Sequence, residues 1–240
     1  MPTRRSERGA AMVLALMAVL FITALGAVLM WTTSSETMIA GSFRHGEAAR
    51  YAAEAAAERV LADLSAPGDW NRLLDGSIRS TFVDGASGGT RTLPDGSSID
   101  LDQQLNLANC HKATNCSIAE MNAGTADRPW GANNPRWKLL AHAPLNALLL
   151  DASLNSPYYA IVLVGDDPAE TDNDPTVDGA DPNNPGSGII AIRAEAFGPR
   201  GAFRAIELTI SRPAGAGRSG DYNDRVLQAG VRILSWREVR

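Results

Sequence analysis

Hydrophobic residues are most concentrated near the start of the chain. Residues 10–31 form 22 consecutive positions in which Thr23 carries the only polar side chain. At about 1.5 Å per residue, a helix of this length measures roughly 33 Å and can cross the ~30 Å hydrocarbon core of a bilayer. A secretory signal has a shorter apolar region of about 7–15 residues, followed closely by a small-residue cleavage site. The pattern therefore predicts a transmembrane helix over residues 10–31, and an ordinary single-pass anchor is the simplest interpretation.

Beyond this segment the pattern changes, but it still predicts a helix. Residues 47–64 are dominated by Ala, Glu, Arg and Leu, which favour helices, and no proline occurs between Pro2 and Pro67. We therefore expect one helix from about Ala10 to Leu64, with residues 32–64 as its amphipathic half. Small or apolar residues recur there every three or four positions and form a single stripe suited to close packing, namely Ile39, Phe43, Gly46, Ala49, Ala53, Ala57, Val60 and Leu64.

Four segments in the second half of the chain have the composition of β-strands. They are Tyr158–Gly165, Gly188–Phe197, Ala202–Ser211 and Arg225–Trp236. The second and third alternate their side chains with a period of two, and the sequence GPRG at Gly198–Gly201 is a glycine-bounded turn typical of a hairpin. We expect a meander of about four antiparallel strands packed on the amphipathic half of the helix.

The predicted fold class is therefore α+β. A long N-terminal helix, made of a membrane half and an amphipathic half, packs against a C-terminal antiparallel β-sheet. Residues 65–240 are expected to form one loop-rich β domain, consistent with 22 glycines and 13 prolines in the chain. Its middle stretch is poorly patterned: we expect short strands at residues 77–83 and 98–107, and partly helical structure at residues 137–150.

Charge excludes one class of partner and orients the membrane helix. The chain has 22 Lys and Arg against 27 Asp and Glu, a net charge of −5, whereas a nucleic-acid-binding domain is expected to show a basic face. Arg4, Arg5 and Arg8 precede the apolar segment against one acid, Glu7. This excess of positive charge predicts a cytoplasmic N-terminus, with the domain after the helix on the opposite side of the membrane.

Two cysteines, Cys110 and Cys116, enclose five residues in the sequence CHKATNC. A metal site would need further ligands, and the chain has only three histidines, His45, His111 and His142. The nearest, His111, directly follows Cys110, so the two side chains point in different directions. A disulfide needs an oxidising compartment, which the predicted topology supplies. We therefore favour a disulfide that closes a short loop over the metal-site interpretation.

An acidic stretch at residues 165–188 joins the first two predicted strands and contains seven Asp and Glu with no Lys or Arg. Like charges repel, so one interpretation is a solvated or disordered loop. The other is a calcium site, because Ca²⁺ takes six to eight oxygen ligands from carboxylates, Asn and carbonyl groups. The stretch does not match the EF-hand pattern. The candidate calcium ligands are Asp166, Asp172, Asp174 and Asp178, and no other cofactor is expected.

Motifs of familiar enzyme classes give catalysis little support. The chain has no H-E-x-x-H zinc motif, no glycine-rich phosphate loop after a predicted strand, and no Cys–His pair with plausible supporting groups. We therefore expect a protein that is not an enzyme and has no catalytic residues.

The N-terminal segment resembles a known family. Four stretches carry the resemblance in order: RGAAMVLAL, TALG, ETMIAGSFR and AAEAAAERV, at residues 8–16, 23–26, 36–44 and 52–60. Together they are similar to the N-terminal region of the PilX group of type IV minor pilins, over about residues 4–64. The resemblance implies a pilin-like fold and a class III signal. In that family, prepilin peptidase removes a leader, here residues 1–9, by cutting between Gly9 and Ala10, and methylates the new N-terminus.

The same resemblance implies a location, partners and a role. It predicts a single-pass inner-membrane protein with a periplasmic C-terminal domain, which moves into a cell-surface pilus on assembly with the major pilin and other minor pilins. Major pilins carry Glu at the fifth mature position, where this chain has Leu14. An acid inside the bilayer is costly and is usually retained for a partner. Its replacement by Leu14 favours a minor subunit near the filament tip that primes or caps assembly.

Two other functions share this N-terminus. One is an adhesin-like binding module carried on a pilin stalk. The other is the tip pseudopilin of a type II secretion system, a group that also lacks the acid but typically carries a larger helical insertion. Two observations together would favour the adhesin: the soluble domain alone binds host or matrix ligands, and filaments still form in cells that lack the protein.

Overall fold

A computed structural model describes six stretches of the chain, with side chains from Gly9 onward. These stretches are residues 6–65, 70–148, 155–170, 173–178, 187–212 and 230–239. The chain divides into two compact units, Met1–Arg44 and His45–Arg240. Each unit is described by itself below.

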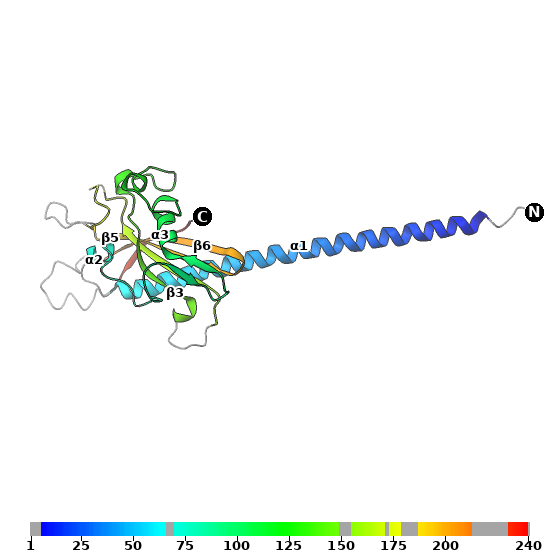
Figure 1. Cartoon of the computed structure of the whole chain (residues 1–240), viewed down its shortest axis with the longest axis horizontal. Helices are drawn as coiled ribbons and strands as arrows, with labels where there is room; N and C mark the ends of the chain where they lie inside the picture. Colours follow the sequence, from blue (N-terminus) through cyan, green and yellow to red (C-terminus); the bar gives the residue numbers. More distant parts are fainter. Residues whose placement is uncertain are drawn as a thin grey trace, which may run out of the picture. The chain divides into compact units, whose positions relative to one another are not determined.

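The first unit contains the N-terminal part of α1 (Ser6–Leu64), a helix of 59 residues that crosses the boundary between the units without a break (Figure 1). From Gly9 this helix is long and apolar enough to span a membrane. Threonine hydroxyls satisfy local carbonyl groups where the sequence becomes polar: Thr32 and Thr33 donate to the carbonyl oxygen of Leu29 at 2.9 Å, and Thr37 donates to that of Thr33. These bonds occupy polar side chains within the helix itself, and α1 continues through this stretch.

The second unit is built on a five-stranded antiparallel sheet in which chain neighbours are also sheet neighbours (Figure 1). Its strands, in both chain and spatial order, are β3 (Lys138–Pro144), β4 (Tyr159–Asp166), β5 (Ile189–Gly198), β6 (Ala202–Ser211) and β7 (Arg232–Val239). A two-stranded sheet, β1 (Thr90–Thr92) with β2 (Ser98–Asp100), is separate from it. The short helices are α2 (Asn71–Leu74), α3 (Leu101–Cys110) and α4 (Ile118–Met121), with 3₁₀ turns η1 (Gly131–Asn133), η2 (Leu145–Leu148) and η3 (Pro199–Gly201).

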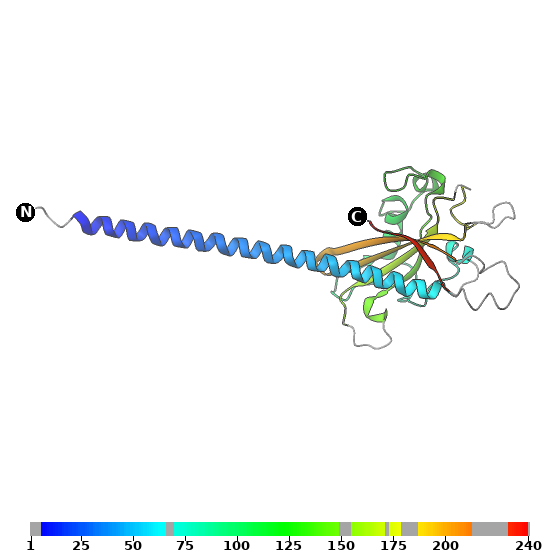
Figure 2. The same ribbon diagram turned by 180° about the vertical axis from the view of Figure 1, so that it is seen from behind.

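The part of α1 within this unit packs on one face of the sheet (Figure 2). The period-two pattern of β5 directs one set of side chains to this face, where they meet a row of alanines on α1. The helix side of the contact is formed by Ala49, Ala52, Ala53, Ala56, Ala57, Val60 and Leu64, and the β5 side by Ile190, Ile192, Ala194 and Ala196. Small side chains let the helix approach the sheet closely, and larger aliphatic side chains from the strands fill the remaining space.

The end of α1 is tied to the segment that follows it by a carboxylate. Asp63 accepts hydrogen bonds from the Ser80 hydroxyl, the Thr81 backbone N–H and the Arg59 guanidinium. Burial alone would raise the pKa of Asp63, but these hydrogen bonds outweigh burial and lower it. The next residue after this anchor, Phe82, accepts a backbone hydrogen bond from His142 of β3. The helix end, this segment and the sheet are therefore linked by polar contacts as well as by the core.

The opposite face of the sheet carries a second, smaller core. It contains the other set of strand side chains together with α3 and residues before β3: Leu93, Leu101, Ala108, Trp137, Leu139, Tyr159, Ile161, Leu163 and Ala191. Asn109 holds α3 to the start of this region, because its side-chain amide donates to the Trp137 carbonyl oxygen at 3.0 Å and accepts from the Trp137 N–H at 2.9 Å. Strands β3, β4 and β5 are thus mostly buried between α1 on one face and the middle of the chain on the other, whereas β7 at the edge is exposed.

The α+β prediction is confirmed, with corrections in detail. Residues 137–150 were expected to be partly helical, and this is only partly right: Lys138–Pro144 forms β3, a fifth strand of the sheet, whereas Leu145–Leu148 forms the 3₁₀ turn η2, and residues 149–150 lie outside the described residues. Residues 98–107 were expected as a strand, but only Ser98–Asp100 is extended and α3 follows at once. The last strand begins at Arg232, and residues 225–229 of its predicted range lie outside the described residues. Of the predicted helical stripe, the members from Gly46 onward are buried, whereas Ile39 and Phe43 are each 69% exposed.

Candidate functional site

The predicted processing site lies within α1. Gly9 and Ala10 are helical and exposed, and a Cβ added to Gly9 would meet no atom within 4 Å. Residues 1–5 of the predicted leader lie outside the described residues. Every residue from Gly9 to Ser34 is exposed, including Leu14, whose exposed fraction is 67%. This apolar surface therefore requires an apolar environment that the described residues do not supply.

The predicted disulfide is present. Cys110 and Cys116 are joined, with their Cα atoms 6.0 Å apart. Cys110 is the last residue of α3, and Cys116 directly precedes Ser117, the N-cap of α4. The chain turns between them at His111, which adopts the left-handed conformation with φ of 58°. The bond therefore fixes the connection between two short helices that could not be stable alone.

Local hydrogen bonds support the same connection. Asp100 caps α3 by accepting from the Gln103 N–H at 2.9 Å, and Ser117 and Glu120 form a reciprocal capping box at the start of α4. Lys112, inside the disulfide loop, forms an ion pair with Glu120. The hydrogen bond from Lys112, together with those from Ser117, lowers the pKa of Glu120 to about 2. The loop is thus held by covalent, capping and ionic contacts at once.

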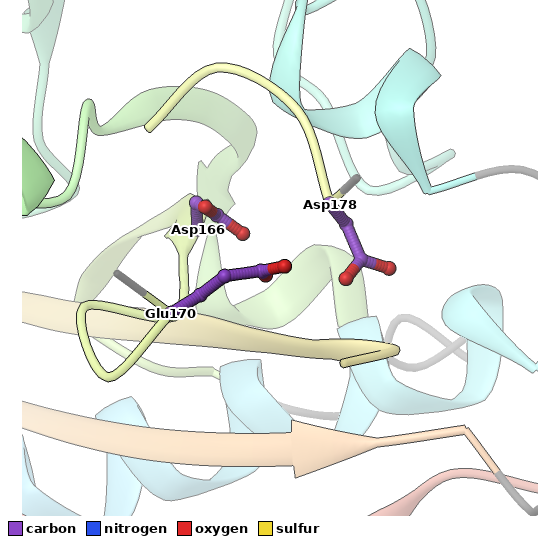
Figure 3. A group of neighbouring side chains, drawn as sticks. All are labelled: Asp166, Glu170 and Asp178. Atoms are coloured by element: carbon purple, nitrogen blue, oxygen red, sulfur yellow. The ribbon is translucent and has the colours of Figure 1, made fainter. Parts of the chain in front are cut away.

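Three carboxylates gather where the acidic stretch leaves and rejoins the sheet. Asp166 ends β4, Glu170 follows it, and Asp178 lies shortly before β5; ligand oxygens of the three lie within 4.8 Å of one another (Figure 3). Asp178 is buried: its N–H donates to the Asn71 side chain at 2.7 Å, and its carboxylate accepts from the Gly188 N–H at 2.9 Å. Burial raises the pKa of Asp178.

The structure brings together only part of the predicted calcium set. Asp166 and Asp178 meet, and Glu170 joins them, although it was not among the predicted ligands. Asp174 lies elsewhere, where its carboxylate accepts from the Thr176 N–H at 3.2 Å. Asp172 lies outside the described residues. Arg212 lies 3.7 Å from the Asp178 carboxylate and already supplies a positive charge. Calcium binding therefore stays a prediction.

Sequence analysis missed a cleft on the face of the sheet opposite α1. The cleft has a volume of about 1010 Å³ and is bounded by β5, β6, β7, α3 and the segment of residues 126–137. Charged side chains cross its floor in alternating order: Glu195, Arg193, Glu207 and Arg237. The first three had been assigned only to a strand pattern, and Arg237 lies just beyond the last predicted strand. Arg193 donates to Glu195 at 2.7 Å and to Glu207 at 2.9 Å, and Arg237 donates to the second oxygen of Glu207 at 3.0 Å.

Burial and pairing shift the pKa values of Arg193 and Glu195. Burial acts to lower the pKa of Arg193, but its two carboxylate partners outweigh burial and raise it. Burial raises the pKa of Glu195, which is 3% exposed, and its Oε2 atom has no hydrogen-bond partner among the described residues. Arg193 and Glu207 lie directly opposite each other on β5 and β6, and Glu207 lies opposite Arg237 on β7. The sheet register therefore places these opposite charges side by side.

A sequence with catalytic precedent does occur, but its local structure does not suit catalysis. GASGG at Gly85–Gly89 matches the G-x-S-x-G pattern, in which the serine sits on a sharp turn between a strand and a helix. Here residues 85–89 form bends that lead into strand β1, and Arg91 donates to the carbonyl oxygens of Ala86 and Gly88. The expectation that the protein is not an enzyme stays a prediction.

Comparisons with family models, with curated proteins and with solved structures found no match for this chain. The proposals below therefore rest on the residues and their geometry, together with the resemblance of the N-terminal segment.

Proposed function

We propose that the protein is a minor pilin that primes or caps type IV pilus assembly near the filament tip. The observation that carries this proposal is the division of α1 into two surfaces. Residues 9–34 are exposed and almost entirely apolar, whereas the stripe from Gly46 to Leu64 is buried under an antiparallel sheet. A simple membrane anchor needs the first surface, but it has no use for a helical continuation that forms part of the core of the next domain.

The two surfaces suit two successive environments. Before assembly, lipid would cover the apolar segment. After assembly, helices of neighbouring subunits would cover it, and small residues at Ala11, Ala15, Ala18 and Gly26 would allow close approach. Processing between Gly9 and Ala10 would separate these stages. The candidate membrane span and the disulfide-linked domain agree with a single-pass inner-membrane precursor whose C-terminal domain is periplasmic.

Leu14 supports a position near the tip. In a repeated subunit, an acid at the fifth mature position would meet the N-terminal amine of a neighbour, and this pairing offsets the cost of placing a charge in an apolar environment. A subunit with no such neighbour gains nothing from the acid, so an apolar side chain is more favourable. The protein would then be present in few copies, in contact with other minor pilins and the major pilin.

Filament composition tests this proposal. Deletion of the gene is expected to lower the number of surface filaments without changing the structure of those that remain, and immunogold labelling is expected to mark filament ends or isolated points. Leu14→Glu should not raise incorporation; Leu16→Glu, also at an exposed apolar position, controls for the cost of an acid in this segment. Even labelling along filaments at major-subunit density would contradict the tip position, as would a large rise in copy number with Leu14→Glu.

The cleft opposite α1 favours a second candidate, an adhesin-like binding module on a pilin stalk. A cavity of about 1010 Å³ falls at the upper end of the size range of small-molecule sites. The two candidates differ in what deletion does. Loss of filaments favours the assembly role, whereas loss of surface binding with normal filaments favours the adhesin.

A further inference from the structure

The cleft on the face of the sheet opposite α1 contains a buried arginine that forms no ion pair with an acid of the described residues. Arg128 is 6% exposed and lines the cleft, and no carboxylate of the described residues forms an ion pair with it. Its Nη2 atom donates to the Pro135 carbonyl oxygen at 2.9 Å, while its Nε atom is buried and finds no hydrogen-bond acceptor in the part of the chain that the structure describes. Buried charges in proteins are normally paired, because removing a lone charge from water is costly.

The charged groups nearest Arg128 do not neutralise its buried positive charge. Burial, followed by the like charges of Arg136 and Arg193, lowers the pKa of Arg128 to about 10, and Glu207 only partly opposes this shift. Glu207 itself is already engaged, since one carboxylate oxygen accepts from Arg193 and the other from Arg237. Glu195 is committed to Arg193 through Oε1. The acids on the floor of the cleft are therefore occupied by Arg193 and Arg237, and Arg128 adds a third guanidinium group to the lining of the same cavity.

The walls of the cleft add an apolar component. Phe197 and Phe203 lie in contact with ring centroids 5.1 Å apart, and Leu107 and Trp130 also line the cavity. Trp130 is 36% exposed, so the cavity is accessible beside an aromatic ring. A ligand that fits this environment would combine an anionic group for the floor with an apolar or aromatic body for the walls.

We propose that the cleft binds an organic carboxylate, with the carboxylate at Arg128 and Arg193 and the apolar part against Phe197, Phe203 and Trp130. A carboxylate suits the planar fork of arginine and would supply the negative charge that no acid of the described residues provides in an ion pair with Arg128. Acids at the rim limit the affinity for small, highly charged anions: Asp127 and Asp167 also line the cleft, as does Glu238, which pairs with Arg204. This proposal is independent of pilus assembly.

Glu195 offers the opposite possibility, which the test must separate. Its buried Oε2 could accept a hydrogen bond from a ligand cation. However, the same carboxylate already accepts from Arg193 through Oε1 at 2.7 Å, so it has a cationic partner within the protein. Arg128 forms no such ion pair with an acid of the described residues, and its pKa of about 10 keeps it protonated at neutral pH.

Binding of small probes to the full chain in nonionic detergent micelles tests the proposal. The probes share one aromatic body: 3-phenylpropionate is the carboxylate, 3-phenylpropanol is neutral and phenethylamine is a cation. Calorimetry gives the affinities, and the Arg128 Nε–H resonance reports the site. We expect 3-phenylpropionate to bind at least about tenfold more tightly than the other two and to shift that resonance, as expected for a charge pair removed from water. Acetate and inorganic phosphate should bind more weakly, because they lack the apolar body.

Two variants locate the binding site. Arg128→Gln is expected to weaken 3-phenylpropionate binding at least about tenfold. Arg232→Gln, which removes the same charge from an exposed position on β7 outside the cleft, should change it less than about twofold. If Arg128→Gln does not fold, the comparison of probes on the wild type remains decisive. Glucuronate and N-acetylphenylalanine then distinguish a sugar acid from a peptide carboxylate, and tighter binding of either than of acetate supports the proposal.

Three results would overturn it: no carboxylate binding to the wild type, binding of phenethylamine as tight as that of 3-phenylpropionate, or equal affinity for phosphate and 3-phenylpropionate. The second result would assign the cleft to a cation at Glu195 or at the rim acids, and the third would make it a general anion site.

Discussion

Removal of the Cys110–Cys116 disulfide should destabilise the domain by a small, calculable amount. The two cysteines are separated by six positions in the sequence. In the chain-entropy model, closing a loop of this size in the unfolded state stabilises the fold by about 2 kcal/mol at 25 °C. For a domain of this size, that corresponds to a melting temperature lower by about 4–8 °C. Because the bond joins the end of α3 to the start of α4, hydrogen exchange should increase mainly in those two helices.

The assay compares wild-type protein with the Cys110→Ser/Cys116→Ser double variant, each in nonionic detergent with and without a reductant. Near-ultraviolet circular dichroism follows the melting of the domain. Reduction should lower the melting temperature of the wild type to that of the variant, whereas the reductant should not change the melting temperature of the variant. Equal melting temperatures for the oxidised and reduced wild type would refute the reasoning, and so would a loss so large that the domain no longer folds.

Three further predictions concern the helix, the sheet and acid stability. Gly198→Ala should cost about 1–3 kcal/mol of unfolding free energy, measured by denaturant titration, because the new Cβ would lie 2.2 Å from the Tyr158 ring. Ala53→Leu should cost a similar amount, since Ala53 is fully buried under the sheet, whereas Ala62→Leu on the exposed side of α1 should be nearly neutral; equal effects would contradict the helix–sheet contact. Asp63 has a lowered pKa in the fold, so its contribution is present above its ordinary pKa of about 4 and is lost as pH falls through the lower folded value. The Asp63→Asn variant should therefore lose less stability than the wild type when the pH falls below about 4. The same dependence of melting temperature on pH in both proteins would count against this.

The helices and strands that the sequence alone predicted well show one clear periodic spacing of apolar residues. The apolar run and the alanine stripe placed the end of the long helix at Leu64, where α1 ends. The alternation in residues 188–197 and 202–211 placed β5 and β6 within one residue of their observed bounds. Each of these patterns reflects burial of one face, which is what periodicity reports.

The elements that sequence missed lack such a period. The interior residues of β3 (residues 139–143) are all buried, because the strand is covered on both faces, so its side chains do not alternate and residues 137–150 resembled a helix as much as a strand. The start of α3 did carry a usable signal, since Asp100 followed by Gln103 is an N-cap pattern, but it was overlooked.

The candidate sites also differ in whether a local sequence pattern marks them. Asp166 and Asp178 could be found because both lie in one acidic stretch, and Glu170 belongs to that stretch as well. The cleft could not be found, because Arg128 lies in an irregular segment and meets Arg193 only through the tertiary fold. Local sequence patterns do not show which side chains from separate segments lie close together in the fold.

The N-terminus of the protein isolated from its native membrane is the measurement on which the pilin proposal depends most. Intact mass and N-terminal sequencing should give a mature chain that begins at methylated Ala10, and Gly9→Val should accumulate as an uncleaved precursor. A Cβ meets no atom within 4 Å at either Gly9 or Gly26, so Gly26→Val is a matched control and should be processed normally. A mature chain that keeps Met1, or begins anywhere other than Ala10, would contradict the proposal.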